Sequence, residues 1–317
     1  MASGEQFLSG EQLSKELNIS RTAVWKRIAA LRREGYPIEA STNKGYRILS
    51  NQAHYGKSGI LSCLSTSFLG RELKYFNTID STNTMLKTLA GQGAPEGTAI
   101  VADAQEKGRG RLGRSWMSSP GLGIWLSILL KPDLHPAMLQ SLTLAAAVAV
   151  CRAIEPFTAK TPGIKWPNDI LIDGKKVCGI LTEMSAEADR VLWVVIGIGV
   201  NVHHSPEDFP EELNGSAASL AMFGKDNQEL DRCKIAAGIM NAMEELYRDF
   251  VKNGPDAMLA EWKQRSVTLG RKVSLKQGDK TLIARVLDIG SDGRLVIETE
   301  DGTVTEILSG EITLRPV

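Results

Sequence analysis

The sequence of 317 residues contains little cysteine, no excess of charge of either sign and no long uninterrupted apolar run. Its four cysteines lie far apart and form no C-x-x-C pair, which argues against a disulfide framework or a zinc knuckle. Lys and Arg together number 37, as do Asp and Glu, so any surface for nucleic acid must be local. The chain starts without the basic and apolar regions of a signal peptide, and runs such as 191–202 contain glycines. We therefore expect a cytoplasmic protein that does not enter a membrane.

The pattern of residues 1–55 predicts a winged helix-turn-helix domain. Ser9 and Gln12 form a capping box for a helix ending near Leu17, and Ser20 can cap a second helix that Gly35 ends. Two short strands, 38–40 and 46–49, then flank a turn. The alternative is a small helical cap on the next domain. A basic cluster on the second helix favours DNA instead; its members are Arg21, Lys26, Arg27, Arg32 and Arg33.

Residues 56–72 are expected to form a linker, and a mixed α/β domain is expected over 73–265. Within it, apolar patterning predicts strands at 98–105, 124–130, 170–172, 175–183 and 191–202. Helices are predicted at 81–91, 139–154, 231–252 and 256–265. From 266 to 317, turn signals recur about every 10 residues between short strands, which is typical of a small β-barrel.

Residues 108–114 are Gly-Arg-Gly-Arg-Leu-Gly-Arg, a segment that no packed core accommodates well. It predicts a mobile loop that wraps an anion through arginine side chains and backbone N–H groups. The formal G-x-G-x-x-G match is misleading, because no helix follows it as a dinucleotide fold requires. Residues 56–58 likewise lack the glycine of a Walker loop. An exposed loop without a ligand remains the alternative.

Two further motifs indicate a functional site only when they are considered together with the rest of the sequence. Lys165-Trp-Pro-Asn-Asp169 places a lysine at a strand edge beside amide and carboxylate groups, although spacing alone favours a surface turn. The glycines of Gly197-Ile-Gly-Val-Asn201 allow close approach of a ligand to a strand, or mark a bulge. We interpret His203 and His204 as surface residues without a metal site. No nucleophile elbow or Cys/His signature is present, so covalent catalysis has no support.

In order and spacing, these motifs together with Asp80-Ser-Thr-Asn83 and Gln105 resemble the biotin–protein ligase family. The winged helix in front resembles the family's bifunctional form, which also represses the biotin operon. The resemblance implies an α+β multidomain fold: a winged helix-turn-helix, a central α/β domain of the biotin/lipoate ligase type and an SH3-like C-terminal β-barrel. It also implies the activation of biotin by ATP and Mg²⁺ to biotinyl-5′-AMP. Biotin then passes to a lysine of biotin carboxyl carrier protein.

The resemblance assigns roles to particular residues. The catalytic residues would be Lys165, Arg111 and Arg109. The biotin-binding residues would be Ser81, Thr82, Asn83, Gln105, Arg109, Gly110, Arg111, Lys165, Gly197 and Gly199. The residues around ATP or the adenylate would be Arg111, Arg114, Trp116, Lys165, Asn168 and Asn201. The residues contacting operator DNA would be Ser20, Arg21, Thr22, Trp25, Lys26 and Arg27.

The same resemblance implies a homodimer loaded with adenylate as the repressing species. The family's repressors carry another helix before the position of Ser9, whereas only 1–7 and Leu8 precede it here, so a DNA-binding domain lacking its first helix is expected. Two other functions remain open: a DNA-binding biotin sensor without ligase turnover, and a related lipoate–protein ligase.

Overall fold

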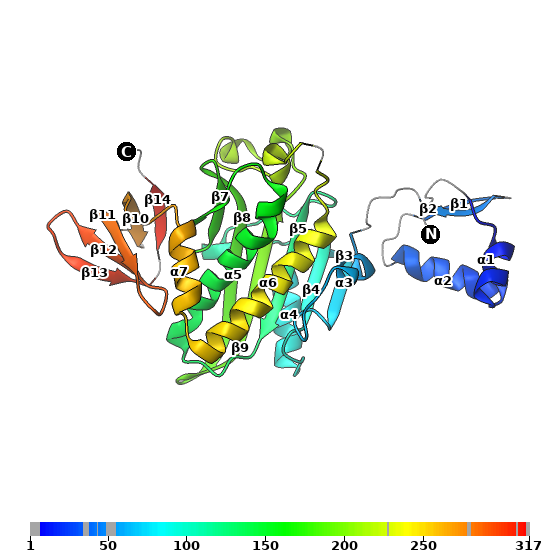
Figure 1. Cartoon of the computed structure of the whole chain (residues 1–317), viewed down its shortest axis with the longest axis horizontal. Helices are drawn as coiled ribbons and strands as arrows, with labels where there is room; N and C mark the ends of the chain where they lie inside the picture. The colour runs from blue at the N-terminus through cyan, green and yellow to red at the C-terminus, as the bar shows by residue number, and fades with distance from the viewer. Residues whose placement is uncertain are drawn as a thin grey trace.

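The computed structural model describes residues 7–33, 38–42, 44–48, 55–226, 228–277, 280–308 and 310–314. A small N-terminal unit lies at one end, a large sheet covered by helices lies in the middle, and a small C-terminal sheet lies at the other end (Figure 1). This is the three-part order expected from the sequence.

The N-terminal unit consists of two helices and a two-stranded antiparallel sheet: α1 (Gly10–Leu17), α2 (Arg21–Arg33), β1 (Ile38–Ser41) and β2 (Gly45–Ile48). Both predicted caps form, because the Ser9 and Ser20 hydroxyls accept from backbone N–H groups three residues on. Ahead of α1, the backbone of Leu8 exchanges hydrogen bonds of 2.8 and 2.9 Å with Tyr46. Residues 1–6, where a first helix would begin, and Gly35 lie outside the described residues.

The central domain is built on a seven-stranded sheet in the order β3-β4-β5-β9-β8-β7-β6. Only β3 and β4 run parallel; every other pairing is antiparallel. The strands are β3 (Leu73–Ile79), β4 (Ala99–Gln105), β5 (Gly123–Leu130), β6 (Gly163–Lys165), β7 (Asp169–Ile172), β8 (Lys175–Glu187) and β9 (Arg190–Asn201). Strand β8 extends four residues beyond the predicted end at 183, pairing with β9 to its last residue.

Helices cover the two faces of this sheet unequally. They are α3 (Lys57–Ser62), α4 (Thr82–Gly91), α5 (Leu139–Ile154), α6 (Arg232–Asn253) and α7 (Asp256–Arg265). Helices α5 and α6 pack side by side over one face, where even-numbered residues such as Ile196 and Ile198 of β9 join the main core (Figure 1). On the other face, Val195 packs with Leu86 of α4. Because side chains alternate along a strand, odd-numbered residues of β5, β8 and β9 line this second face.

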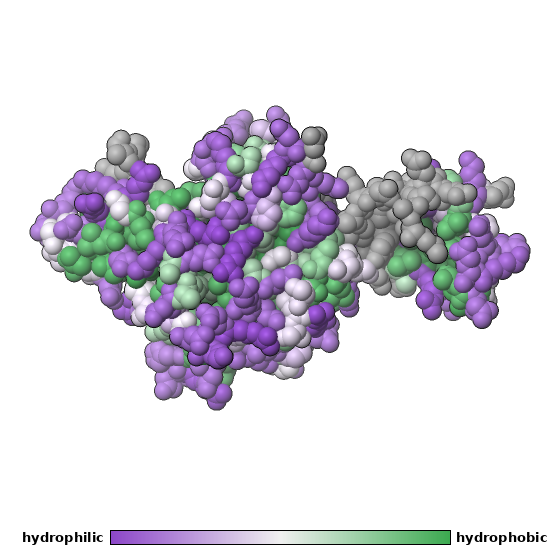
Figure 2. All heavy atoms as spheres, in the orientation of Figure 1, coloured by the Kyte–Doolittle hydropathy of each residue, from purple (hydrophilic) through white to green (hydrophobic). Residues whose placement is uncertain are grey.

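Helix α5 and its flanks, Pro136–Phe157, are long and apolar enough to cross a membrane, but 72% of the most apolar stretch is buried inside the protein. The helix therefore serves as the core helix of the central domain. The outer surface over α6 and α7 is largely hydrophilic (Figure 2), as expected of helices that bury only one side.

The segment 56–72 is part of this core and not a free linker, contrary to the sequence-based prediction. Ile60 and Leu69 are fully buried. The carboxylate of Glu244 on α6 accepts hydrogen bonds from the backbone N–H groups of Ser67, Phe68 and Leu69 at 2.7, 3.0 and 2.9 Å. The sequence could not reveal this packing, because backbone N–H groups leave no residue pattern and their acceptor, Glu244, lies about 175 residues further along the chain.

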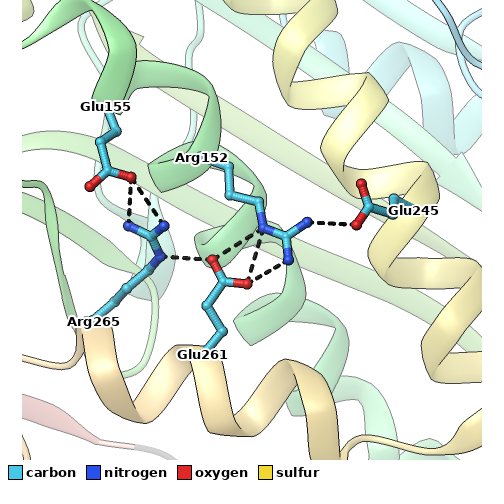
Figure 3. A network of polar contacts seen from close by, with 5 residues as sticks. All are labelled: Arg152, Glu155, Glu245, Glu261 and Arg265. Carbon is cyan, nitrogen blue, oxygen red and sulfur yellow. Dashed lines mark hydrogen bonds and ion pairs between the residues drawn. The ribbon is translucent and has the colours of Figure 1, made fainter.

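A polar network joins the three helices on the α5 face (Figure 3). Arg152 of α5 donates to Glu261 of α7 and to Glu245 of α6, while Arg265 of α7 bridges Glu261 and Glu155. Hydrogen bonds from the two arginines hold the pKa of Glu261 below its usual value, with burial acting against them. The network orients α7, which leads into the C-terminal sheet.

The C-terminal unit is an antiparallel sheet in the order β13-β12-β11-β10-β14. Its strands are β10 (Lys272–Gln277), β11 (Lys280–Ile289), β12 (Leu295–Thr299), β13 (Val304–Ile307) and β14 (Glu311–Leu314). The expected all-β character of this region is confirmed. Two tight contacts join it to the central domain: Trp166 Nε1 donates to Gly293 O at 3.1 Å, and Ser141 Oγ donates to Ser291 O at 3.1 Å.

Candidate active site

A cavity of about 530 Å³ opens on the sheet face opposite α5 and α6, because odd-numbered residues of β9 such as Gly197 and Gly199 line it. Every residue that the sequence analysis assigned to biotin, ATP or catalysis lines this cavity: Ser81, Thr82, Asn83, Gln105, Arg109, Gly110, Arg111, Arg114, Trp116, Lys165, Asn168, Gly197, Gly199 and Asn201. Four motifs that are far apart in the sequence therefore meet at one place, although the role of each residue stays a prediction.

One end of the cavity is polar and built on the start of α4. The Ser81 hydroxyl caps this helix, accepting from Thr84 N. The next residue, Thr82, donates its backbone N–H to Gln105 Oε1 at 2.9 Å, and Gln105 Nε2 donates to Ser118 Oγ at 2.9 Å. A helix start thus supports a set of directed donors and acceptors, as recognition of a small polar ring requires.

Gly197 of β9 leaves the space in which the Asn83 side chain lies beneath this end of the cavity. A Cβ added to Gly197 would lie 2.1 Å from Asn83 Oδ1, so only glycine lets the Asn83 amide lie against β9. Asn83 is 4% exposed, and its Oδ1 accepts from the buried hydroxyl of Ser127 at 2.6 Å. The space over Gly197 is therefore taken by a side chain of the protein, which refines the expectation that this glycine faces the ligand directly.

The Arg-Gly loop is held in place over the cavity by its own hydrogen bonds. Gly110 N donates to Arg114 O at 2.7 Å, and Trp116 N donates to Gly108 O at 2.9 Å. The loop is also tied to the sheet, because Arg111 Nη1 donates to Asn168 Oδ1 at 2.9 Å. At its tip, Leu112 adopts a left-handed φ of 55° with its side chain 77% exposed. The loop is thus a short hairpin in this structure, and its mobility stays a prediction.

The Lys-Trp-Pro-Asn-Asp motif is not a surface turn. Lys165 ends β6 and Asp169 begins β7, which places the turn between them at the cavity. Trp166 is 1% exposed, and its backbone N–H donates to Thr268 Oγ1 at 3.1 Å. Asn168 Nδ2 donates to Ile180 O at 2.9 Å. The buried indole and these bonds hold Lys165 at the strand edge, as the functional interpretation of the motif expected.

The opposite end of the cavity is aromatic. The Trp116 indole lies over two paired glycines, since added Cβ atoms at Gly199 and Gly179 would lie 2.6 and 2.8 Å from its ring atoms. Its Nε1 is buried and hydrogen-bonds to none of the described residues. Lys176 Nζ lies 5.2 Å from the centre of this ring, a cation–π contact. The partly exposed indole offers a flat surface suited to stacking against a ring.

Two titratable residues of the cavity lining escaped the sequence analysis. Lys176 forms an ion pair of 2.6 Å with Asp169, and its only local signal is a Lys-Lys pair after a turn. His204, interpreted as a surface residue, is 1% exposed and stacks on Phe209 at 5.1 Å. Burial lowers the pKa of His204, although nearby Asp208 opposes that shift. Only the tertiary contact with Phe209 and Trp125 buries it, so no local pattern could have found it.

The side chains that line the cavity carry an excess of positive charge. Its lining includes the cationic side chains of Arg109, Arg111, Arg114, Lys165 and Lys176, against the single carboxylate of Asp169. Such a field attracts a polyanion and offsets repulsion between two anionic reactants. The described residues contain no group of three or more His, Cys, Asp or Glu side chains placed to hold a metal ion.

The comparisons with known proteins agree with this geometry. Residues 75–201 match the biotin/lipoate A/B protein ligase family, residues 1–47 match an HTH domain, and residues 268–315 match the biotin protein ligase C terminal domain. Fold and site therefore define a protein of the biotin/lipoate ligase class.

Individual relatives narrow this class. The bifunctional ligase/repressor BirA of Bacillus subtilis (strain 168) is 42% identical over 98% of this chain and 95% of its own length. The BirA of Escherichia coli (strain K12) is 30% identical over 99% and 95%. The biotin protein ligase from Aquifex aeolicus in complex with biotin and ATP superposes with a TM-score of 0.65, at 32% identity, over 78% of this chain and all of that one. The chain belongs to the family of bifunctional biotin ligase/repressors.

Proposed function

We propose that this protein is an ATP-dependent biotin–protein ligase that forms biotinyl-5′-AMP and transfers biotin to a lysine of biotin carboxyl carrier protein. The observation that carries this proposal is a single cavity whose lining combines the polar groups at the start of α4, the Trp116 indole and five cationic side chains. Joining a carboxylate to a triphosphate brings two anions together, and the cations offset that repulsion.

The proposed roles follow from position. Ser81, Thr82 and Gln105 bind the polar ring of biotin, with Gly197 making room for Asn83 beneath it. Lys165 and Lys176 hold the carboxylate and the α-phosphate, while Arg111 and Arg114 face the other phosphates. Gly110 and Gly199 allow the loop and the Trp116 indole to approach, and Asn168 and Asn201 border the adenylate. The reaction then needs orientation and charge stabilisation, with no covalent enzyme intermediate.

A Mg²⁺ ion fits this site as a companion of the nucleotide. Magnesium demands few protein ligands where phosphates and water supply the rest. Asn168 and Asp169 place an amide and a carboxylate oxygen in the cavity lining. The ion would supply further neutralisation of phosphate charge, while the five cationic side chains orient the reactants.

The deciding experiment is biotin-dependent ATP–pyrophosphate exchange with the purified protein. We expect exchange in the wild type and its loss in Lys165→Ala and in Lys176→Ala. Lys175→Ala, which removes a neighbouring exposed lysine outside the cavity, is the matched control and should exchange normally. No exchange in the wild type would favour a biotin sensor without turnover, and competition by lipoate would favour a lipoate ligase.

A second function, repression, rests on the N-terminal unit. Val24 is buried at 2% exposure, whereas six residues of α2 and its cap are exposed to solvent: Ser20, Arg21, Thr22, Trp25, Lys26 and Arg27. Trp25 is 62% exposed, which is unusual for so large an apolar side chain. An exposed basic helix of this kind suits the major groove of operator DNA.

We further propose that the repressing species is a cytoplasmic homodimer loaded with adenylate. Sedimentation of the full-length protein tests it: the dimer should appear with biotin and ATP together and not with either alone. A monomer under both conditions would contradict the dimer while leaving the ligase proposal untouched.

A further inference from the structure

Glu183 on β8 lies behind the polar end of the cavity and is not among the residues assigned above to a role. Its side chain is 20% exposed. Three groups donate to its carboxylate: Lys87 Nζ at 2.7 Å, Asn83 Nδ2 at 3.0 Å and Arg109 Nη1 at 3.2 Å. One carboxylate therefore contacts α4, the floor of the cavity and the Arg-Gly loop at once.

The carboxylate determines which way the Asn83 amide points. Asn83 Nδ2 donates to Glu183 Oε2 and to Leu181 O at 3.2 Å, so the amide nitrogen faces two acceptors. The amide oxygen must then face Ser127, whose hydroxyl lies 2.6 Å away. An amide orientation follows from its hydrogen-bond partners, and an ionised carboxylate can only accept. Although burial favours the neutral acid, hydrogen bonds from Lys87 and Asn83 hold the pKa of Glu183 below its usual value.

The orientation of the Asn83 amide determines how the hydroxyl of Ser127, and next to it that of Thr82, can form hydrogen bonds at the cavity. Because the Asn83 oxygen can only accept, the single proton of Ser127 Oγ points toward it. Ser127 then has no proton left for Thr82, whose Oγ1 lies 2.7 Å from Ser127 Oγ and 3.1 Å from the acceptor Gln105 Oε1, so the one proton of Thr82 is used inside the protein. Thr82 is left with its oxygen lone pairs available in the cavity, which it lines. A substrate N–H group is the complementary partner for such an oxygen.

We propose that Glu183 is a positioning residue for the biotin ring, because it orients Asn83 and, through Ser127, presents the Thr82 oxygen as an acceptor for a substrate N–H. The inference rests on the proposed ligase function. Lys87 and Arg109 balance the charge of the carboxylate, so it stays ionised beside the cavity without repelling an anionic substrate.

Glu183→Gln tests the inference with little change of volume. A glutamine can accept from Asn83 only by turning its NH₂ group toward Lys87 and Arg109, where it meets cations. If it turns the other way, the Asn83 amide must reverse so that its Nδ2 faces Ser127, and the Ser127 proton then turns to the Thr82 oxygen and occupies it. Ser127→Ala removes the connection between Asn83 and Thr82 while leaving the Glu183 charge in place. Glu187→Gln, four residues along β8 and exposed, is the matched control.

Biotin binding by titration calorimetry and the KM values of the exchange reaction are measured on the full-length variants. Glu183→Gln and Ser127→Ala should each weaken biotin binding about tenfold, with the KM for ATP and the melting temperature nearly unchanged. Glu187→Gln should behave as the wild type. Unchanged biotin affinity in both variants, or a joint rise of both KM values with a lowered melting temperature, would overturn the positioning role. A wild type that fails to bind biotin would instead refute the proposed function itself.

Discussion

Replacing Gly197 by alanine should damage the polar end of the cavity, where we propose that biotin binds. The added Cβ would lie 2.1 Å from Asn83 Oδ1, whereas ordinary contact begins near 3.4 Å. Asn83 has little freedom to retreat, because it is buried, and it is hydrogen-bonded to Ser127, Leu181 and Glu183. The strand cannot move either, since β9 pairs on both sides with β5 and β8.

The size of the effect follows from these contacts. Overpacking a buried site costs about 1–3 kcal/mol, and displacing Asn83 sacrifices at least one buried hydrogen bond worth roughly 1 kcal/mol. We therefore expect Gly197→Ala to lower the free energy of unfolding by about 2–4 kcal/mol. In a domain of this size that corresponds to a fall in Tm of roughly 5–15 °C. Biotin affinity should fall at least about tenfold, because Asn83 supports the polar end.

Thermal unfolding and biotin titration of the same samples measure both effects. Gly91→Ala is the control, because an added Cβ there meets no atom within 4 Å at the end of α4. That variant should be as stable as the wild type or slightly more stable, since alanine loses less backbone entropy than glycine. If Gly197→Ala bound biotin with wild-type affinity, the close packing of Asn83 on β9 would not matter for binding, and our account of this glycine would be wrong.

Three other perturbations test separate parts of the molecule. Glu244→Ala leaves three backbone donors without their acceptor, of which only that of Leu69 is buried, and should cost about 2–4 kcal/mol. Glu245 is 74% exposed at the edge of the helix network, and Glu245→Ala should cost less than about 1 kcal/mol. Burial lowers the pKa of His204, so the neutral ring contributes its full stability above the ordinary histidine pKa of about 6.5 and loses it as the pH falls below that value. The KM for ATP should therefore rise between pH 7 and pH 5.5. His204→Phe should remove that rise. Arg27→Ala should reduce by about one the slope of log affinity for operator DNA against log salt, and an unchanged slope would remove Arg27 from the DNA contact.

Local signals in the sequence were sufficient for most elements. Ser9, Ser20 and Ser81 were predicted as caps, and each caps a helix in the structure, because a cap depends on residues three positions apart. The apolar runs of β5 and α5 were predicted to within a residue of their ends. The motifs of the cavity were also found, since each is contiguous in the sequence.

The misses share a cause: they depend on contacts between distant segments. Glu183 is one of many acidic residues in the sequence, and only the pairing of β8 with β9 places it beside Asn83. His204 follows a polar-looking His-His pair, yet Phe209 and Trp125 bury it. Residues 56–72 look like a linker because their packing partner, Glu244, lies on a helix near the other end of the chain.

The buried Trp166 bears on how far this protein can be divided or recombined. Its indole N–H is satisfied by Gly293, and its backbone N–H by Thr268, so both partners come from beyond the end of α7. A fragment that stopped at Arg265 would keep Lys165 and Asn168 but lose Thr268 and Gly293, the two residues that hold Trp166. Exchange of C-terminal sheets between relatives should therefore succeed only where the new sheet also places a backbone carbonyl at the position of Gly293 O. The C-terminal sheet, although separate in sequence, thus has to match the turn that holds Lys165.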